Sequence, residues 1–170
     1  DAKGVVYVIK FDPPCCPGMA SAPGVISGRI LYAAGYNVTE DFAVDFRREE
    51  LRLGENVTIT DPDGTKRPMT PEDLEKILAS VEPDPNGSWR AIASKFLSGK
   101  PMGPFDWNGR RGDDPNDHVR HENRRELRGL RVIAAWLAHF DMKQHNTRDM
   151  YVEDSGRRYV LHHLFDFGST

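Results

Sequence analysis

The C-terminal segment, residues 139–170, constrains the fold of this chain more than any other part of the sequence. The runs 150–152 and 159–161 are rich in β-forming residues and flank Asp154, Ser155 and Gly156. Two such runs around a short turn that contains Gly predict a β-hairpin. The hairpin carries the chain from one cluster of polar residues to another, which raises the question whether both clusters belong to one site.

A long amphipathic helix is predicted before the hairpin, over residues 117–138. Its apolar residues recur at helical spacing and form one face: Leu127, Leu130, Ile133, Ala134 and Leu137. The helix brings the chain to His139. The residues that follow it begin the first polar cluster.

The first strand and the first helix of the chain are predicted from residues 5–34. The run 5–11 (VVYVIKF) follows a turn-forming DAKG and is predicted to be the second arm of a hairpin, with Lys10 inside the strand. Ser21 is expected to cap a helix that has Pro23 in its first turn and ends at Gly35. The apolar face of this helix is expected at Val25, Ile26, Ile30 and Leu31.

The middle of the chain is predicted to be mostly β with one further helix. Strands are expected at 38–46, 56–60 and 89–97, and Asp61 to Gly64 has the composition of a tight turn. Thr70, Pro71 and Asp73 have the pattern of a capped helix start, followed by an apolar stripe of Leu74, Ile77, Leu78 and Val81. The middle segment therefore alternates short strands with a single amphipathic helix.

A Gly- and Pro-rich break at residues 99–104 continues as a polar loop to about Asn116. Such a break is typical of a boundary between structural units. We therefore expect a mostly β first lobe over residues 1–100, with one helix after the Lys strand and an inserted helix. Residues 101–170 are expected to begin a helical second lobe.

Composition excludes several classes of function. The net charge is −3, from 23 Lys and Arg against 26 Asp and Glu, which gives no argument for a nucleic-acid partner. The longest apolar run, 132–137, is far too short to cross a bilayer, so no membrane span is expected in this chain. A signal peptide that was removed is left open, so the compartment stays unknown: the chain is cytoplasmic, or exported if it once carried such a peptide.

The local basic run and the histidines have simple structural interpretations. Acidic residues are interleaved with the arginines, which favours an ion-paired helix face over an anion or partner site. These arginines are Arg110, Arg111, Arg120, Arg124, Arg125, Arg128 and Arg131. His118 and His121 have the spacing of one helix face, but no third metal ligand accompanies them, and the adjacent Cys15 and Cys16 do not form a zinc pattern.

The polar clusters around the hairpin contain the residue types that phosphoryl transfer requires. Transfer from ATP needs a carboxylate near the acceptor, hard oxygen ligands for Mg²⁺ and a cation on the phosphates. Asp141 and Asn146 precede the hairpin, Asp166 follows it, and Lys10 lies in the first predicted strand. The chain therefore contains this set of groups in order.

The spacing of these residues resembles the protein-kinase-like superfamily. His139-Phe140-Asp141 followed by Asn146 is similar to the catalytic loop His-x-Asp-x-x-x-x-Asn, and Asp166-Phe167-Gly168 is similar to the magnesium-binding Asp-Phe-Gly. The strings HENRRELRGLRVIAAWLAHFD, LFDFGST, KFDPP and LYAAGYNV resemble an uncharacterised bacterial branch, distantly like toxin kinases and spore-coat kinases. The resemblance covers nearly the whole chain.

The resemblance implies a fold and a role for each motif residue. It implies an α+β, two-lobed kinase-like fold that is incomplete at both ends. Asp141 would be the catalytic base, Asn146 and Asp166 the Mg²⁺ ligands, and Lys10 the lysine on the α and β phosphates of ATP. Gly168 would complete the nucleotide-binding triplet. Residues 96–102 would form the hinge beside adenine.

Two functions follow from the resemblance. The first is transfer of the γ-phosphate of ATP to a hydroxyl of a protein or small molecule. The second is a catalytically inactive kinase-like module that serves as a subunit of a larger assembly. The second is favoured by the absence of an acidic residue in 21–34, where Gly24 stands at the expected Glu position, and by the lack of a glycine-rich loop.

A docked module would be expected to present aromatic side chains to its partner. Trp107 and Trp136 are candidates by residue type. Packing within the molecule is the simpler expectation for Trp136, which lies in the predicted long helix.

Overall fold

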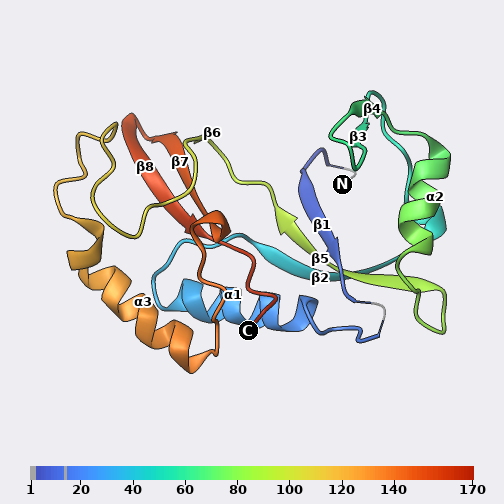
Figure 1. Cartoon of the computed structure of the whole chain (residues 1–170), viewed down its shortest axis with the longest axis horizontal. Helices are drawn as coiled ribbons and strands as arrows, with labels where there is room; N and C mark the ends of the chain where they lie inside the picture. The colour runs from blue at the N-terminus through green and yellow to red at the C-terminus, as the bar shows by residue number, and fades with distance from the viewer. Residues whose placement is uncertain (1–2, 14) are drawn as a thin grey trace.

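The computed structural model describes residues 3–13 and 15–170 of the chain. Helices and strands are mixed along the chain, so the expected α+β class is confirmed. In Figure 1 the strand pair β3–β4 and helix α2 lie together at one end of the molecule, and α3 lies with the β7–β8 hairpin at the other. Helix α1 and the β1–β5–β2 sheet lie between them.

The central sheet contains β1 (Tyr7–Phe11), β5 (Ser88–Lys95) and β2 (Asp41–Arg47), in the antiparallel order β1-β5-β2. Strand β5 is the middle strand, and its apolar residues at 91–93 are buried. The prediction of a strand around Lys10 is confirmed. The expected first arm of a hairpin is not seen, because β1 pairs with β5 and no strand precedes it within residues 3–13.

The register of this sheet determines which side chains share a face. Lys10 pairs with Ile92 on β5, and Val8 pairs with Ser94. Asp41 on β2 also pairs with Ser94. Because side chains alternate between the two faces of a strand, these residues all point to one side of the sheet.

Helix α1 (Ser21–Ala33) is confirmed, but its buried face differs from the predicted one. The buried residues are Ser21, Gly24, Ser27, Gly28 and Leu31. Ile26, which was expected to be buried, is 58% exposed. Small residues line the face because the C-terminal segment packs directly on the helix: a Cβ atom at Gly28 would lie 3.6 Å from the Phe167 ring.

The cap of α1 comes from outside the helix. The Ser21 side chain does not cap the helix; Ala20 is the N-cap residue and makes no side-chain capping bond. Instead, the buried Asp12 carboxylate accepts hydrogen bonds from the backbone N–H groups of Gly18, Ala20 and Ser21 and from the Ser21 hydroxyl. Asp12 follows β1 directly, so this contact joins the Lys10 strand to the start of α1 and places a carboxylate at the positive end of the helix.

The inserted segment folds as predicted around its turn and its cap. Strands β3 (Thr58–Thr60) and β4 (Lys66–Pro68) form a separate pair, and the turn between them is closed by a bond from Gly64 N–H to the Asp61 carbonyl. Helix α2 (Pro71–Ala79) begins after Thr70, whose hydroxyl accepts from Asp73 N–H. A short 3-10 helix, η1 (Arg48–Glu50), follows β2.

The C-terminal hairpin is confirmed and extends further than predicted. Strands β7 (Thr147–Asp154) and β8 (Arg157–Leu164) pair along their full length, and the short β6 (Lys100–Pro101) adds to β7. Ser155 and Gly156 both have positive φ values, 51° and 76°, as a two-residue hairpin turn requires. Val38 forms a parallel bridge with Leu164, so the segment before β2 meets the end of the hairpin.

The predicted helix over 117–138 is wrong in its first third. Helix α3 spans Arg125–Trp136, and only a 3-10 turn, η2 (His121–Asn123), precedes it. Asp117 holds this part as a loop: its buried carboxylate accepts from the Arg111 N–H, from the His121 ring and from the Arg124 guanidinium. These bonds satisfy the carboxylate in a loop geometry that a straight helix does not provide.

Several arginines of the basic run 110–131 make ion pairs, but Arg111 and Arg120 make theirs in the loop before α3 and not on a helix. Arg111 binds the buried Asp149 of β7, and Arg120 pairs with Glu122. The expectation of a continuous ion-paired helix face is therefore wrong for residues 110–124, which precede α3. His118 and His121 likewise do not share a helix face, because His118 lies before η2, which begins at His121.

The buried face of α3 meets α1 and the C-terminal segment in one core. Leu130, Leu31 and Phe167 form its buried cluster, with Leu127, Ile133 and Leu137 packed against it. Trp136 is 73% exposed, so the expectation that it packs within the molecule is wrong. No helix among the described residues is long and apolar enough to span a membrane.

Candidate functional site

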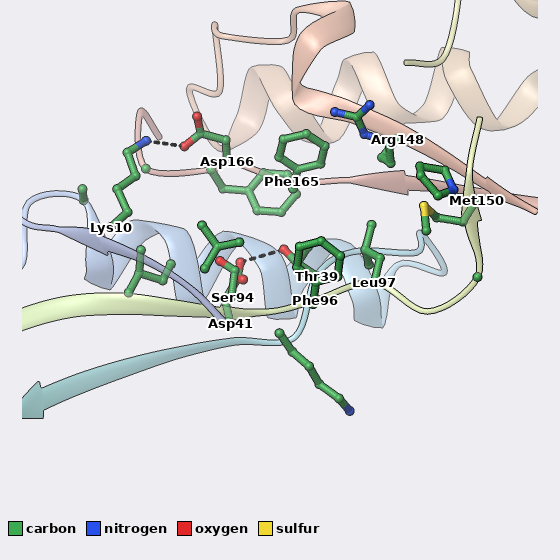
Figure 2. Close-up of a pocket in the computed structure, with 18 residues that line it drawn as sticks. Lys10, Thr39, Asp41, Ser94, Phe96, Leu97, Arg148, Met150, Phe165 and Asp166 are labelled. Atoms are coloured by element: carbon green, nitrogen blue, oxygen red, sulfur yellow. Dashed lines mark hydrogen bonds and ion pairs between the residues drawn. The ribbon is translucent and has the colours of Figure 1, made fainter. Parts of the chain in front are cut away.

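A cavity of about 440 Å³ lies between the cavity-facing side of the central sheet and the segment formed by β7 and residues 165–168. Figure 2 shows its two walls, with Asp41 and Ser94 on the sheet side and Phe165, Asp166 and Arg148 on the other. Most lining side chains are apolar. The lining residues include Val8, Lys10, Thr39, Asp41, Ile92, Ser94, Leu97, Gly99, Arg148, Met150, Phe165, Asp166 and Gly168.

Lys10 and Asp166 meet at one end of this cavity. The Lys10 ammonium donates to Asp166 Oδ1 at 2.6 Å, and both side chains remain partly accessible to solvent. Figure 2 shows the two side chains reaching toward each other, Lys10 from β1 and Asp166 from the segment after β8. The structure therefore brings together two predicted site residues that lie far apart in the sequence.

The backbone at Asp166 is held in a conformation that non-glycine residues seldom adopt. Its φ value is 63°, in the left-handed region. The next residue, Phe167, is buried in the core beside the His139 ring, with the two ring centroids 5.4 Å apart. Burial of Phe167 thus anchors the segment and directs the preceding carboxylate toward the cavity, a kind of local strain that is common at functional sites.

Gly168 lies where α1 begins. An added Cβ atom there would lie 3.3 Å from the Cβ atom of Ala20. Further along α1, the Thr170 hydroxyl lies 2.8 Å from the Ser27 hydroxyl. The C-terminal residues are therefore packed along α1, and Gly168 keeps this approach close.

Asp141 and Asn146 lie beside the cavity and do not line it. The Asn146 amide donates to the backbone carbonyl of Asp141 at 2.9 Å and to its carboxylate at 3.1 Å. The backbone of Asn146, which ends the 3-10 turn η3 (Gln144–Asn146), accepts from Phe165 N–H. This bond places the loop with Asp141 next to the residue that precedes Asp166, so the two polar clusters are neighbours at the base of the hairpin.

Lys143 is a charged residue of this loop that the sequence reasoning missed. Its ammonium lies 2.6 Å from Asp141 Oδ1. The hydrogen bond from Lys143 lowers the pKa of Asp141, with a further contribution from Asn146. The pKa of Lys143 is raised, first by Asp141 and to a lesser extent by the charge of Asp166. The sequence did contain a signal for this ion pair, because Lys143 stands only two positions after Asp141.

His139 supports the loop from the core. Ala138 has a φ value of 54° and ends α3, and the His139 N–H then bonds the Ala134 carbonyl at 2.8 Å. The imidazole is buried, and burial lowers its pKa in spite of the negative charges of Asp141 and Asp166. His139 is therefore a packing residue beside the two acids, and its burial favours the neutral imidazole.

The side chains of Asp166 and Asn146 have free oxygen atoms that suit a magnesium ion. Within residues 3–13 and 15–170, Asp166 Oδ2 and Asn146 Oδ1 make no hydrogen bond. Mg²⁺ binds oxygen ligands and takes few of them from a protein, so these two oxygens are of the type that such an ion uses. No cluster of three or more His, Cys, Asp or Glu side chains suited to a metal occurs among the described residues.

Helix α1 supplies no carboxylate to Lys10. At Gly24, an added Cβ atom would lie 2.6 Å from Cδ1 of Ile92, so the helix lies too close to β5 for an acidic side chain. Glu40, the first acid after this helix, pairs with Lys95 at 2.7 Å. Asp166 is therefore the acid that holds Lys10 in this structure.

Asp41 is a second acid in the cavity that the sequence reasoning missed. Its Oδ2 accepts from the Thr39 hydroxyl at 3.1 Å, while its Oδ1 is buried without a hydrogen-bond partner among the described residues. Burial raises the pKa of Asp41, and the nearby charge of Asp166 raises it further. In the sequence, only the alternation of polar and apolar residues along β2 pointed to Asp41. That alternation does not show which face of the strand lines a cavity.

The linker after β5 forms the far edge of the cavity. Gly99 has a φ value of 100°, and a Cβ atom there would lie 2.5 Å from the Tyr151 carbonyl oxygen, so only Gly fits against β7. In the part of the chain that the structure describes, the backbone N–H and C=O groups of Leu97, Ser98 and Gly99 make no hydrogen bond with other backbone groups. Of these three residues, Leu97 and Gly99 line the cavity.

Comparison of the chain with protein-family models, with curated proteins and with solved structures gave no match.

Proposed function

We propose that this cavity binds ATP with magnesium and that the chain transfers the γ-phosphate to an acceptor hydroxyl. The observation that carries the proposal is the 2.6 Å pair of Lys10 and Asp166 at one end of an apolar cavity. A cation and a carboxylate with a free oxygen are the groups that phosphates and Mg²⁺ require. The apolar walls and the unpaired backbone of residues 97–99 suit a flat base at the other end.

Each residue of the proposed site has a task that follows from its surroundings. Asp166 and Asn146 would hold Mg²⁺, which neutralises charge on the phosphates when it is bound. Lys10 would move from Asp166 to a phosphate oxygen. Asp141, kept ionised by Lys143 and Asn146, would accept a hydrogen bond from the acceptor hydroxyl and orient it. Lys143 would then face the phosphoryl group that is transferred.

Calorimetric titration of ATP into the protein, with and without Mg²⁺, tests the proposal. Binding that requires Mg²⁺ and is lost in Asp166→Ala is the expected result. Asp141→Ala should retain this binding, because the Asp141 carboxylate does not line the cavity. The same variant should abolish phosphate transfer, because the acceptor hydroxyl is no longer oriented. Absence of binding at millimolar nucleotide, or full turnover in both variants, would refute the proposed site.

A second candidate function is a catalytically inactive kinase-like subunit of a larger assembly. The close approach of α1 at Gly24, which leaves Lys10 without a helix carboxylate, favours it. Exposed apolar side chains also favour it: Val132, Trp136 and Phe140 are 70%, 73% and 84% exposed. The titration above separates the two candidates, since a purely structural subunit need not bind nucleotide.

A further inference from the structure

Among the described residues, the cavity has one basic side chain, Arg148, without a hydrogen-bond or ion-pair partner. Of the basic side chains that line it, Lys10 pairs with Asp166 and Lys95 pairs with Glu40. The Arg148 side chain makes no hydrogen bond or ion pair with any of the residues that the structure describes. A guanidinium group has five N–H donors, a planar shape and no acceptor, so its unmet interactions must come from elsewhere.

The position of Arg148 on β7 determines which part of a ligand it can contact, the phosphates or the ring. Arg148 and Met150 alternate along this strand and both line the cavity. Figure 2 shows Arg148 near Phe165, on the wall opposite Leu97 and Thr39, whereas the Lys10–Asp166 pair lies at the other end of the view. Phosphates drawn to Lys10 and a metal at Asp166 would therefore lie away from Arg148.

Val8 and Ile92 line the sheet side of the cavity and Arg148 lines the opposite wall, so a flat ring between the two walls can present one face to Arg148. The edge of such a ring can bond the unpaired backbone of residues 97–99, and its other face would lie against the sheet at Val8 and Ile92. A planar cation above an aromatic face is attracted by the π electrons of the ring, most strongly where water is displaced.

We propose that Arg148 selects the ligand of this cavity by stacking its guanidinium on the face of an aromatic base. The identity of the base as the purine of a nucleotide rests on the proposed function. In this arrangement the Arg148 contribution belongs to the ring and not to the phosphates. Its effect is accordingly the same for a nucleoside and for its nucleotide.

Titration of adenosine and of ADP with Mg²⁺ into wild type, Arg148→Leu and Arg148→Lys tests this. Arg148→Leu should lose affinity for both ligands by a similar factor, roughly 2- to 30-fold, because a stacked cation contributes about 0.5–2 kcal/mol. Arg148→Lys keeps the cation but lacks the planar group that stacks on a ring, so its affinity for both ligands should lie between those of wild type and Arg148→Leu. Arg158→Leu on β8, which removes an exposed arginine paired with Glu153, is the matched control and should bind as wild type does.

The outcomes separate this inference from the proposed function. Wild-type binding of both ligands with unchanged affinity in Arg148→Leu would overturn the stacking role alone. A loss confined to ADP would also overturn it, since Arg148 would then contact phosphate. Failure of the wild type to bind either ligand would overturn the nucleotide function together with the inference. Thermal melting of each variant establishes that a loss of affinity is not a loss of folding.

Discussion

Lys10 and Asp166 are 156 positions apart in the chain, yet their side chains form an ion pair of 2.6 Å at the end of an apolar cavity. The pair exists because two separate anchors position its members. Asp12 bonds the start of α1 directly after the Lys10 strand, and Phe167 is buried directly after Asp166. The pair thus links the central sheet to the segment that follows the hairpin.

Replacing either member of this pair should affect ligand binding far more than folding. Because both side chains are partly exposed, Lys10→Met and Asp166→Asn should change the free energy of unfolding by about 0.5 kcal/mol or less. Each should lower the affinity for Mg²⁺-ATP by roughly tenfold or more, since a charge-assisted contact with phosphate or metal is lost. Urea denaturation and nucleotide titration measure the two effects. A large loss of stability would instead assign the pair a structural role.

Asp12→Ala should destabilise the protein through the start of α1. The variant leaves three backbone N–H groups and the Ser21 hydroxyl without their acceptor, at a cost of about 2 kcal/mol or more. Burial raises the pKa of Asp12, but the hydrogen bonds from Ser21, Gly18 and Ala20 outweigh it and lower the pKa overall.

The pH dependence of this contact follows from the lowered pKa. The stabilisation by Asp12 is present above its ordinary pKa and is lost as the pH falls through the lower folded-state pKa. Urea denaturation from pH 7 to pH 2 should therefore show the difference between wild type and Asp12→Ala shrinking at the acid end. A difference that is constant with pH would exclude the charge as its cause.

Asp41→Asn should stabilise the protein at neutral pH. The folded state raises the pKa of Asp41, first through burial, so ionising this group opposes folding. The penalty is absent below its ordinary pKa, grows as the pH rises from that value toward the raised pKa and is complete above it. The variant keeps an oxygen that can accept from Thr39.

Thermal melting at pH 7 and at pH 3 measures this effect. The variant should melt at a higher temperature than wild type at pH 7, and the two should agree closely at pH 3. Equal melting at pH 7 would show that Asp41 is ionised in the fold without cost. A residue that lowers stability is often kept because function needs it. The ligand affinity of Asp41→Asn should therefore be measured in parallel.

Gly24→Ala should be destabilising although Ala favours helices. The new methyl group would lie 2.6 Å from Cδ1 of the buried Ile92, so α1 or β5 must move. The gain in helix propensity is at most about 1 kcal/mol, and overpacking in a core costs about 1–3 kcal/mol. Gly28→Ala is the matched control on the same helix, because its methyl group would lie 3.6 Å from the Phe167 ring in ordinary contact.

Denaturation of both variants, with Ile92→Val added to each, measures the clash directly. Ile92→Val removes the atom that the Gly24 methyl group would strike, so it should cost less in Gly24→Ala than in wild type. It should cost the same in Gly28→Ala as in wild type. Equal costs in all backgrounds would show that α1 does not rest on Ile92.

Local patterns determined much of the secondary structure. The turn at Ser155 and Gly156 demanded two residues that tolerate positive φ, and the flanking β-forming runs paired as the sequence indicated. The cap at Thr70 and Asp73 started α2 because both groups lie within one turn of chain. Signals of this kind are legible because the interacting residues are neighbours in sequence.

The errors arose where distant contacts overrode local preference. Residues 117–124 have a helical pattern, but the buried Asp117 binds Arg111 and Arg124 in a loop. The buried face of α1 is set by Phe167 and not by its own largest apolar residues, so Ile26 is exposed. Neither partner is visible in the sequence near the residue that it affects.

The sequence by itself determined that Lys10 lies in a strand, that a hairpin separates Asp141 and Asn146 from Asp166, and that α and β elements mix. Only the tertiary structure decided that Lys10 meets Asp166, that α1 lies too close to β5 to carry an acid, and that Asp41 and Arg148 line the same cavity. The reason is physical: backbone geometry follows from residues a few positions apart, whereas a cavity is formed by side chains from strands that pair across the whole chain.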